Sequence, residues 1–357
     1  MHLRRTFGIP LLLVLTGCAT GSRTIPEAWL SVPEAARIGS VELGADGKVQ
    51  TSPDVPPKRL ADGPIALAGT RLTHGLKVLT EPYAAVDSFD YLESRGEVVF
   101  SAKRTDNFDI GLVSADGGKV NWVPEDRADE RLVSWAPRGS KIAYVVRGSG
   151  GDLIRTVHVP TSFALNVDVP RGRVHALSWD PAGDRFAVVI SAADASDRVE
   201  VMKYGGEERR IAVPPAVRLD VDVEPFAPGA IILRPRSLAY SEKLPVVVWL
   251  ADDVNEWSDA RAALLGDARV ACIVTTAVSD ALWKTIETTP WLDGGRAFTV
   301  GAPGKGLAVV AGDAVPAGRY TRRNNVLAVP PAVVQSFAAR FIADQLKRTP
   351  PTNGSSR

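Results

Sequence analysis

The stretch "SWDPAGDRFAVVIS", residues 178–191, joins a tryptophan, a Pro/Gly turn and an apolar run, and it recurs along the chain. The similar stretch "SWAPRGSKIAYVVR" begins 44 residues earlier, at 134, and "GEVVFSAK" begins at 96, which is 44 residues before Ser140. A fixed period of this length is typical of a repeat architecture. The repeat therefore sets the expected fold of the central part of the chain.

Each unit of the repeat holds four short strands. In the unit from 178 onward, a Pro/Gly turn joins the first two strands, "DRVEVMKY" (197–204) alternates as a third, and "RRIAV" (209–213) returns as an edge strand. A period in the low forties with four strands indicates the blade of a β-propeller. We predict an all-β propeller over 64–225 with about four recognisable blades; the alternative is a β-sandwich whose strands recur. Either the ring is small, or further blades lie in the weakly patterned region 25–63.

The C-terminal third has a different pattern. The continuous apolar run "PVVVWL" (245–250) is typical of a parallel strand buried on both faces. Helix-like segments at 256–267 and 332–348 alternate with strand-like segments, which indicates a small α/β domain with a mostly parallel sheet over 226–348. Within it, "FTVGAPGKGLAVVAG" (298–312) predicts a strand, a glycine-rich turn and the start of a helix. This is where such folds keep a nucleophile or a phosphate loop.

The first residues predict export and a lipid anchor. A basic pair, an apolar run and small residues form a signal peptide over 1–17. The sequence "LTGC" (15–18) looks like a bacterial lipobox, which implies a lipidated Cys18; the alternative is an ordinary secretory signal with a chance cysteine. Several acyl chains on one cysteine anchor stably. We expect 18–63 to be a lipid-anchored tether with an irregular lead-in, and 349–357 to be a disordered tail. The protein would lie in the cell envelope, on the outer membrane in a Gram-negative host, facing the periplasm or the exterior.

Composition excludes several functions. A net charge of +1 provides no basic field for nucleic acid. The histidines left after removal of the signal are His74, His158 and His175, and their spacing is not that of metal ligands. We therefore predict no metal and no cofactor. Cys272 has no expected disulfide partner and is predicted to be a small buried side chain.

The "SWxPxGxxxAxxx" pattern resembles the TolB-type propeller repeat, which also occurs in the propeller of the prolyl oligopeptidase family. A propeller followed by "LPVVVWL" (244–250) resembles that family as well, and the resemblance implies a C-terminal α/β-hydrolase domain. The family's nucleophile motif is eroded here, because Pro303 stands at the serine position. Ala251-Asp252-Asp253-Val254 replaces the family's histidine-glycine loop, and no histidine follows His175. Without a base, a neutral serine cannot be activated.

Two loops keep alternatives open. Asp252 and Asp253 follow the first strand of the sheet, where open α/β sheets bind ligands, so they form either a ligand or metal loop or a solvated loop. The turn at 301–306, with Lys305, is either a structural turn or a backbone nest for an anion.

From these observations we predict a lipoprotein that acts as a non-catalytic binding or scaffold protein for a protein or peptide partner, with a degenerate hydrolase-like domain. The alternative is a hydrolase or peptidase of the prolyl oligopeptidase type with relocated catalytic residues, centred on His158 or His175. In a third interpretation the C-terminal domain only caps the propeller.

Overall fold

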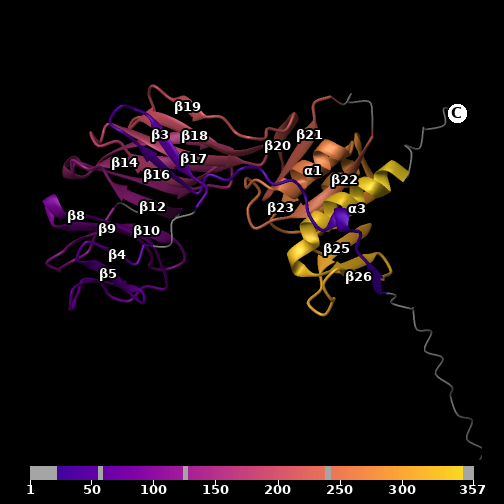
Figure 1. Cartoon of the computed structure of the whole chain (residues 1–357), viewed down its shortest axis with the longest axis horizontal. Coiled ribbons are helices and arrows are strands. Elements are labelled where there is room, and N and C mark those ends of the chain that lie inside the picture. The colour runs from indigo at the N-terminus through magenta and orange to yellow at the C-terminus, as the bar shows by residue number, and fades with distance from the viewer. Residues whose placement is uncertain (1–21, 55–58, 124–127, 238–242, 349–357) are drawn as a thin grey trace, which may run out of the picture.

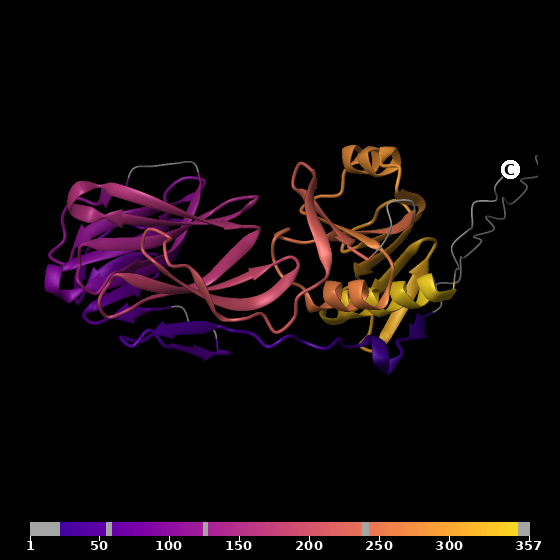
Figure 2. The same cartoon turned by 90° about the horizontal axis from the view of Figure 1, so that it is seen from above.

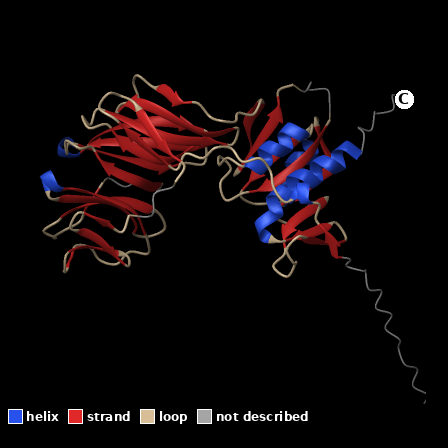
Figure 3. Ribbon diagram, in the orientation of Figure 1, coloured by secondary structure: helices blue, strands red, loops and turns tan. Residues whose placement is uncertain are grey.

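The computed structural model describes residues 22–54, 59–123, 128–237 and 243–348. The chain forms two bodies side by side (Figure 1). The first body consists of small sheets, and the second combines one large sheet with the three α-helices (Figure 3). Cys18 and the predicted tail fall outside the described residues. Within the described ranges, no helix has the length and apolar character to cross a bilayer.

The first body contains four-stranded antiparallel sheets in which successive strands pair as neighbours. The described residues form four of them: β4(Ala61–Asp62), β5(Ile65–Ala68), β6(Arg71–His74), β7(Lys77–Val78); β8(Val86–Leu92), β9(Glu97–Lys103), β10(Phe108–Ser114), β11(Asn121–Trp122); β12(Asp129–Trp135), β13(Lys141–Arg147), β14(Gly151–His158), β15(Phe163–Pro170); and β16(Gly172–Trp179), β17(Arg185–Ala192), β18(Ala195–Lys203), β19(Arg210–Val213). Short 3₁₀ turns, η2(Glu93–Arg95) and η3(Val159–Thr161), join strands within them. The three copies of the repeat are β9, β13 and β17, the second strand of successive sheets, so the prediction of recurring short strands is confirmed.

These sheets pack face to face in a row, because each central strand has apolar side chains on both faces. Along β13, Ile142 and Tyr144 pack toward β8–β11, whereas Ala143 and Val145 pack toward β16–β19. The repeated tryptophans lie in the layers between sheets: Trp135 in the first of these layers and Trp179 in the second. The 44-residue period of the sequence therefore corresponds to one four-stranded sheet together with the apolar layer that packs it against the next sheet.

The described part of the segment before β4, residues 22–54, is structured and contacts both bodies. β2(Ser40–Leu43) and β3(Val49–Ser52) form a hairpin whose Val41 and Leu43 cover the outer face of β16–β19. Upstream, β1(Ser22–Thr24) pairs with the large sheet of the second body, and η1(Glu27–Trp29) follows it. Trp29 packs edge-on against Phe337 and Phe341, with ring centroids 5.6 Å apart. Figure 2 shows this indigo segment running along both bodies.

The predicted tether over 18–63 is therefore wrong for the described part of that region, 22–54 and 59–63. Besides the local β2–β3 hairpin, it makes contacts with residues far away in the sequence. The backbone N–H of Ala35 donates to Asp259 at 2.9 Å, and that of Ile38 donates to Asp197 at 2.8 Å. Such pairing needs no local periodicity, which is why the pattern of the sequence is weak there.

The second body is built on one mixed sheet. Its strands are β20(Val221–Ala227), β21(Ala230–Pro235), β22(Leu244–Leu250), β23(Ala271–Thr275), β24(Leu292–Val300), β25(Leu307–Ala311), β26(Arg319–Arg323) and β27(Val326–Val329), in the order β1-β26-β27-β25-β24-β22-β23-β21-β20. The five central strands, from β27 to β23, run parallel, and the outer pairings are antiparallel. The expectation of a mostly parallel sheet thus holds for the centre only.

Helices cover both faces of this centre. α1(Asp259–Asp267) and α3(Val334–Arg348), the latter preceded by η4(Pro331–Val333), pack on the face that carries Val247 and Trp249. α2(Asp280–Thr288) packs on the opposite face, over Val246 and Val248. Burial on both faces explains why β22 is apolar at every position rather than at alternate ones.

Candidate functional site

The glycine-rich turn after β24 does not lead into a helix. β24 ends at Val300, the turn spans 301–306, and the chain continues as β25, which pairs in parallel with β24 so that Phe298 lies opposite Leu307. Gly306 has φ +81°, and a Cβ there would clash with the carbonyl oxygen of Ala297. The turn therefore folds back on its own strand. The prediction of a helix start at this point is wrong.

This geometry decides what the turn can do. Pro303 lies in an exposed connection between two strands, so the position that resembles the nucleophile site is not on a strand-to-helix elbow. Lys305 forms an ion pair with Glu287 of α2, with Nζ and Oε1 2.5 Å apart. Because its charge is already paired, Lys305 does not favour the anion nest, and the structural-turn interpretation accounts for the contacts.

The loop after β22 joins the two bodies. Asp253 accepts a hydrogen bond from Nε of Arg173, on β16 of the first body, and another from the backbone N–H of Asn255 at 2.8 Å. The Asn255 side chain donates to the carbonyl of Ser149 at 2.8 Å. Asp252 is exposed beside them. Among the described residues, no three His, Cys, Asp or Glu side chains gather as metal ligands would, and the contacts of Asp253 are those of a link between the bodies.

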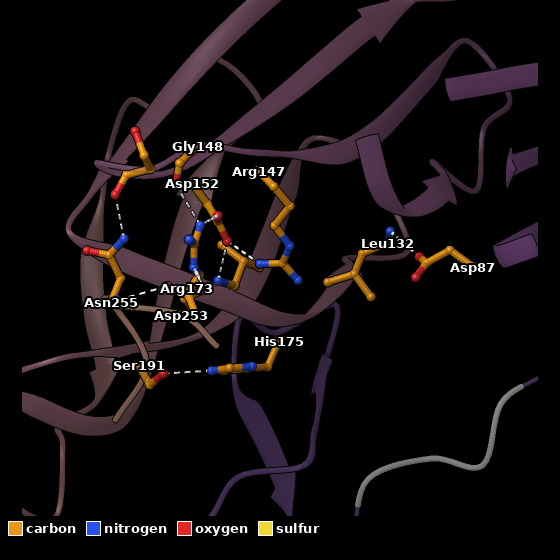
Figure 4. Close-up of polar contacts among 12 residues, drawn as sticks. Asp87, Leu132, Arg147, Gly148, Asp152, Arg173, His175, Ser191, Asp253 and Asn255 are labelled. Carbon is orange, nitrogen blue, oxygen red and sulfur yellow. Dashed lines mark hydrogen bonds and ion pairs between the residues drawn. The ribbon is translucent and has the colours of Figure 1, made fainter. Parts of the chain in front are cut away.

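Arg173 is the centre of what we term the bridging cluster, formed by Arg147, Asp152, Arg173 and Asp253 (Figure 4). Nη1 of Arg173 donates to Asp152, whose side chain is 0% exposed, and to the carbonyl of Gly148 at 2.8 Å. Asp152 also accepts from Arg147 and from the backbone N–H of Val174. Burial works against the charge on Arg173, but the hydrogen bonds and charges of Asp253 and Asp152 outweigh it and raise the pKa of the guanidinium.

A cleft of about 460 Å³, termed the central cleft, lies beside this cluster and is lined by both bodies. Its volume falls within the range of ligand sites. The walls are largely apolar, and they include Val223, Pro225 and Ile231 of β20 and β21. Arg171 projects from the first body, is exposed, has φ +56° and forms no ion pair with the described residues. A non-glycine residue held at positive φ is strained, and such positions cluster at functional sites.

A histidine–serine contact lies close to the bridging cluster, and the sequence does not reveal it. Nε2 of His175 is 2.6 Å from the hydroxyl of Ser191 on the neighbouring strand β17. Ser191 is only 1% exposed, and no described residue hydrogen-bonds to Nδ1 of His175. A bulge between Val174 and Ala176 shifts the strand register at this point, so spacing alone cannot pair the two residues. His158 instead contacts Thr161 at 2.8 Å.

The buried environment of His175 predicts how the stability of the protein changes with pH. Burial lowers the pKa of its imidazole, and the charge of Asp197 only partly opposes this. The unfolded chain then takes up a proton at a higher pH than the folded protein, so stability falls as pH drops below about 6.5. We expect the melting temperature of the wild type to fall more between pH 7.5 and pH 5.5 than that of His175→Gln, measured by thermal unfolding. Parallel curves for the two proteins would contradict this assignment.

The fold resembles those of several known proteins, although the chain matches no protein-family model. Solved structures that resemble it include prolyl oligopeptidase B from Galerina marginata (12% identity, 72% of this chain, 44% of that chain, TM-score 0.49). Others are an acylaminoacyl peptidase from Pyrococcus horikoshii (10%, 62%, 41%, 0.48) and TolB from Acinetobacter baumannii (14%, 53%, 46%, 0.36).

These structures are of the same types as the proteins that the sequence repeat and the run at 244–250 resemble. The chain spans less than half the length of each of the three.

Proposed function

We propose that the protein is a non-catalytic binding protein that receives a protein or peptide partner in the central cleft. The observation that carries this proposal is the lining of the cleft. It includes the hydroxyl-bearing Ser149 and Thr276 but no histidine that could act as their base. The turn at 301–306 also supports a non-catalytic function. It stands where the resembled family has its nucleophile, and it contains no Ser or Cys.

In this proposal the sheets of the first body are the blades of a small TolB-like propeller over 64–225, and 226–348 is a degenerate hydrolase-like domain. The row of face-to-face sheets and the parallel centre of the large sheet support this division. Loops at one end of such blades form broad binding surfaces. The loop 148–150 and Arg171 belong to such an end, and they face the second body across the cleft.

The chemistry of the central cleft favours an extended peptide with an acidic group. Apolar walls would bury its side chains, and Arg171 offers a cation that no described residue pairs. Panning a random decapeptide library against the full chain in detergent tests this. We expect selected peptides to bind Arg171→Glu at least tenfold more weakly than the wild type, in line with the loss of a charged hydrogen bond of about 1.5–3 kcal/mol.

Arg138→Glu is the matched control, because Arg138 is also an exposed arginine of the first body and does not line the cleft. Peptides that bind both variants as tightly as the wild type would refute the cleft as the binding site. Equal losses in both would show that only the net charge matters.

The alternative function, a hydrolase with relocated residues, is favoured by one observation, the contact between Ser191 and His175. Against it stands the burial of Ser191. Incubation with a fluorophosphonate probe separates the two proposals. We expect no saturable labelling of the folded protein. Saturable labelling that is lost in Ser191→Ala would establish the hydrolase instead.

We further propose that the mature protein begins at Cys18 and is held by acyl chains on that residue to a membrane of the cell envelope. The sequence "LTGC" supports this. Mass spectrometry of the N-terminal peptide tests it: an unmodified cysteine, or cleavage elsewhere, would rule the anchor out.

A further inference from the structure

A second cavity, of about 470 Å³, is also lined by the loop that follows β22. We term it the polar cavity. Asp252 and Asp253 separate it from the central cleft, and both line the two spaces. Its remaining walls come from the segment after η1, from α1 and from the start of α3. Three regions far apart in the sequence thus converge on a space of the size that small ligands occupy.

Arg261 lines this cavity and is the most unusual side chain in it. The residue is 2% exposed, its Nη2 donates to the carbonyl of Glu256, and its Nε has no hydrogen-bond partner. No carboxylate among the described residues forms an ion pair with it. A buried charge without an ion-pair partner is costly, and the more distant carboxylates of Glu256 and Asp253 offset only part of that cost. Burial accordingly lowers the pKa of Arg261.

The position of Arg261 on α1 adds to this cost. The helix begins at Asp259, and the side chain of its N-cap, Ser258, accepts the backbone N–H of Arg261. The cation therefore lies in the first turn, where the helix dipole disfavours positive charge. Neither helix electrostatics nor core packing favours an arginine there, but an anionic ligand in the cavity would.

The other charged side chains at the cavity indicate which second group such a ligand would carry. Asp259 already accepts hydrogen bonds from the backbone N–H of Ala35 and from Nε1 of Trp257, and it forms an ion pair with Arg37. Asp253 accepts a hydrogen bond from Arg173. Glu34, Asp252 and Glu256 are exposed at the rim. A purely anionic ligand would meet this acidic rim, whereas a ligand that also carries a cation would be attracted by it.

We propose that the polar cavity binds a small zwitterion of the amino-acid class, with its carboxylate on Arg261 and its ammonium group toward Asp252 and Glu256. Charge-assisted hydrogen bonds to a guanidinium are the usual means of holding a carboxylate. This site is distinct from the central cleft and does not depend on the peptide proposed there.

Tryptophan fluorescence of the full chain in detergent tests the proposal, since Trp249 and Trp257 line the cavity. Each standard amino acid is titrated separately. For alanine the matched probes are ethylamine, which lacks the carboxylate, and propionate, which lacks the ammonium group; the best binder receives the same two analogues. We expect saturable binding of at least one amino acid, and at least tenfold weaker binding of both its analogues. No binding by any amino acid, or equal binding of the amine alone, would overturn the proposal.

Variants of Arg261 separate a ligand role from a structural one. We expect Arg261→Met to lose at least tenfold in affinity while the melting temperature of the free protein stays the same or rises, because an unpaired buried charge has been removed. Arg261→Lys should retain weakened binding. Unchanged affinity in Arg261→Met would refute the proposal, as would a large drop in melting temperature in both variants without any ligand-induced shift in the wild type. Arg171→Glu should bind the amino acid normally, so failure here and failure at the central cleft can be told apart.

Discussion

Replacement of Arg173 by methionine is expected to lower the free energy of unfolding by about 3–5 kcal/mol, the range found when one partner of a buried ion pair is removed. Asp152, whose side chain is 0% exposed, would keep Arg147 and the Val174 N–H but lose its second cation. Asp253 would lose its partner across the two bodies at the same time. Urea unfolding at neutral pH, monitored by tryptophan fluorescence, measures the change.

The control is Arg185→Met, in the adjacent strand of the same sheet. Arg185 pairs with Glu208, but the two side chains are 47% and 52% exposed, so little change is expected. If both variants lose the same stability, the bridging cluster does not hold the bodies together. If Arg173→Met leaves the unfolding curve unchanged, the cluster contributes nothing to the fold.

The second large effect is expected at the turn after β24. Gly306→Ala should cost about 3 kcal/mol or more, because the new Cβ combines a strained positive φ with a backbone clash. The residue has φ +81°, and the carbonyl oxygen of Ala297 occupies the space that the methyl group would need. The turn could then no longer fold back on β24, and the pairing of β24 with β25 would be lost. Thermal and urea unfolding of the variant measure the cost.

Gly318→Ala is the matched control in the same body, since Gly318 has φ +71° but no atom within 4 Å of the position that a methyl group would take. It should cost only about 1–2 kcal/mol, the contribution of the backbone conformation alone. Equal effects at the two glycines would show that the turn is not packed against its strand. That result would favour the sequence-based prediction of a helix start at 307–311, and with it a strand-to-helix elbow at the position that resembles the nucleophile site.

Local pattern predicts the elements whose burial is periodic. The 44-residue repeat places β9, β13 and β17, and the unbroken apolar run at 245–250 places β22 in a sheet covered on both faces. The amphipathic pattern at 332–348 likewise matches α3. In each case the side chains of one short segment decide which faces are apolar, so the segment alone carries the signal.

The wrong predictions concern segments whose structure is decided by partners far away in the sequence. The pattern at 307–311 predicts the start of a helix, but these residues form β25 because the backbone at Gly306 folds back and β24 and β27 pair on either side. The composition before β4 predicts a tether, but Trp29 and the β2–β3 hairpin find their partners in distant parts of the chain. Contacts of this kind are invisible to a local window.

The sequence by itself determined the repeat, the change from short antiparallel sheets to a sheet with helices, and the presence of Pro303 where the resembled family has its nucleophilic serine. Only the tertiary structure decided which polar groups meet among the described residues: Arg173 with Asp253, His175 with Ser191, and Arg261 with no ion-pair partner. The physical reason is that apolar burial follows the local period of a strand or helix, whereas the pairing of buried charges depends on the three-dimensional arrangement of segments that lie far apart in the sequence.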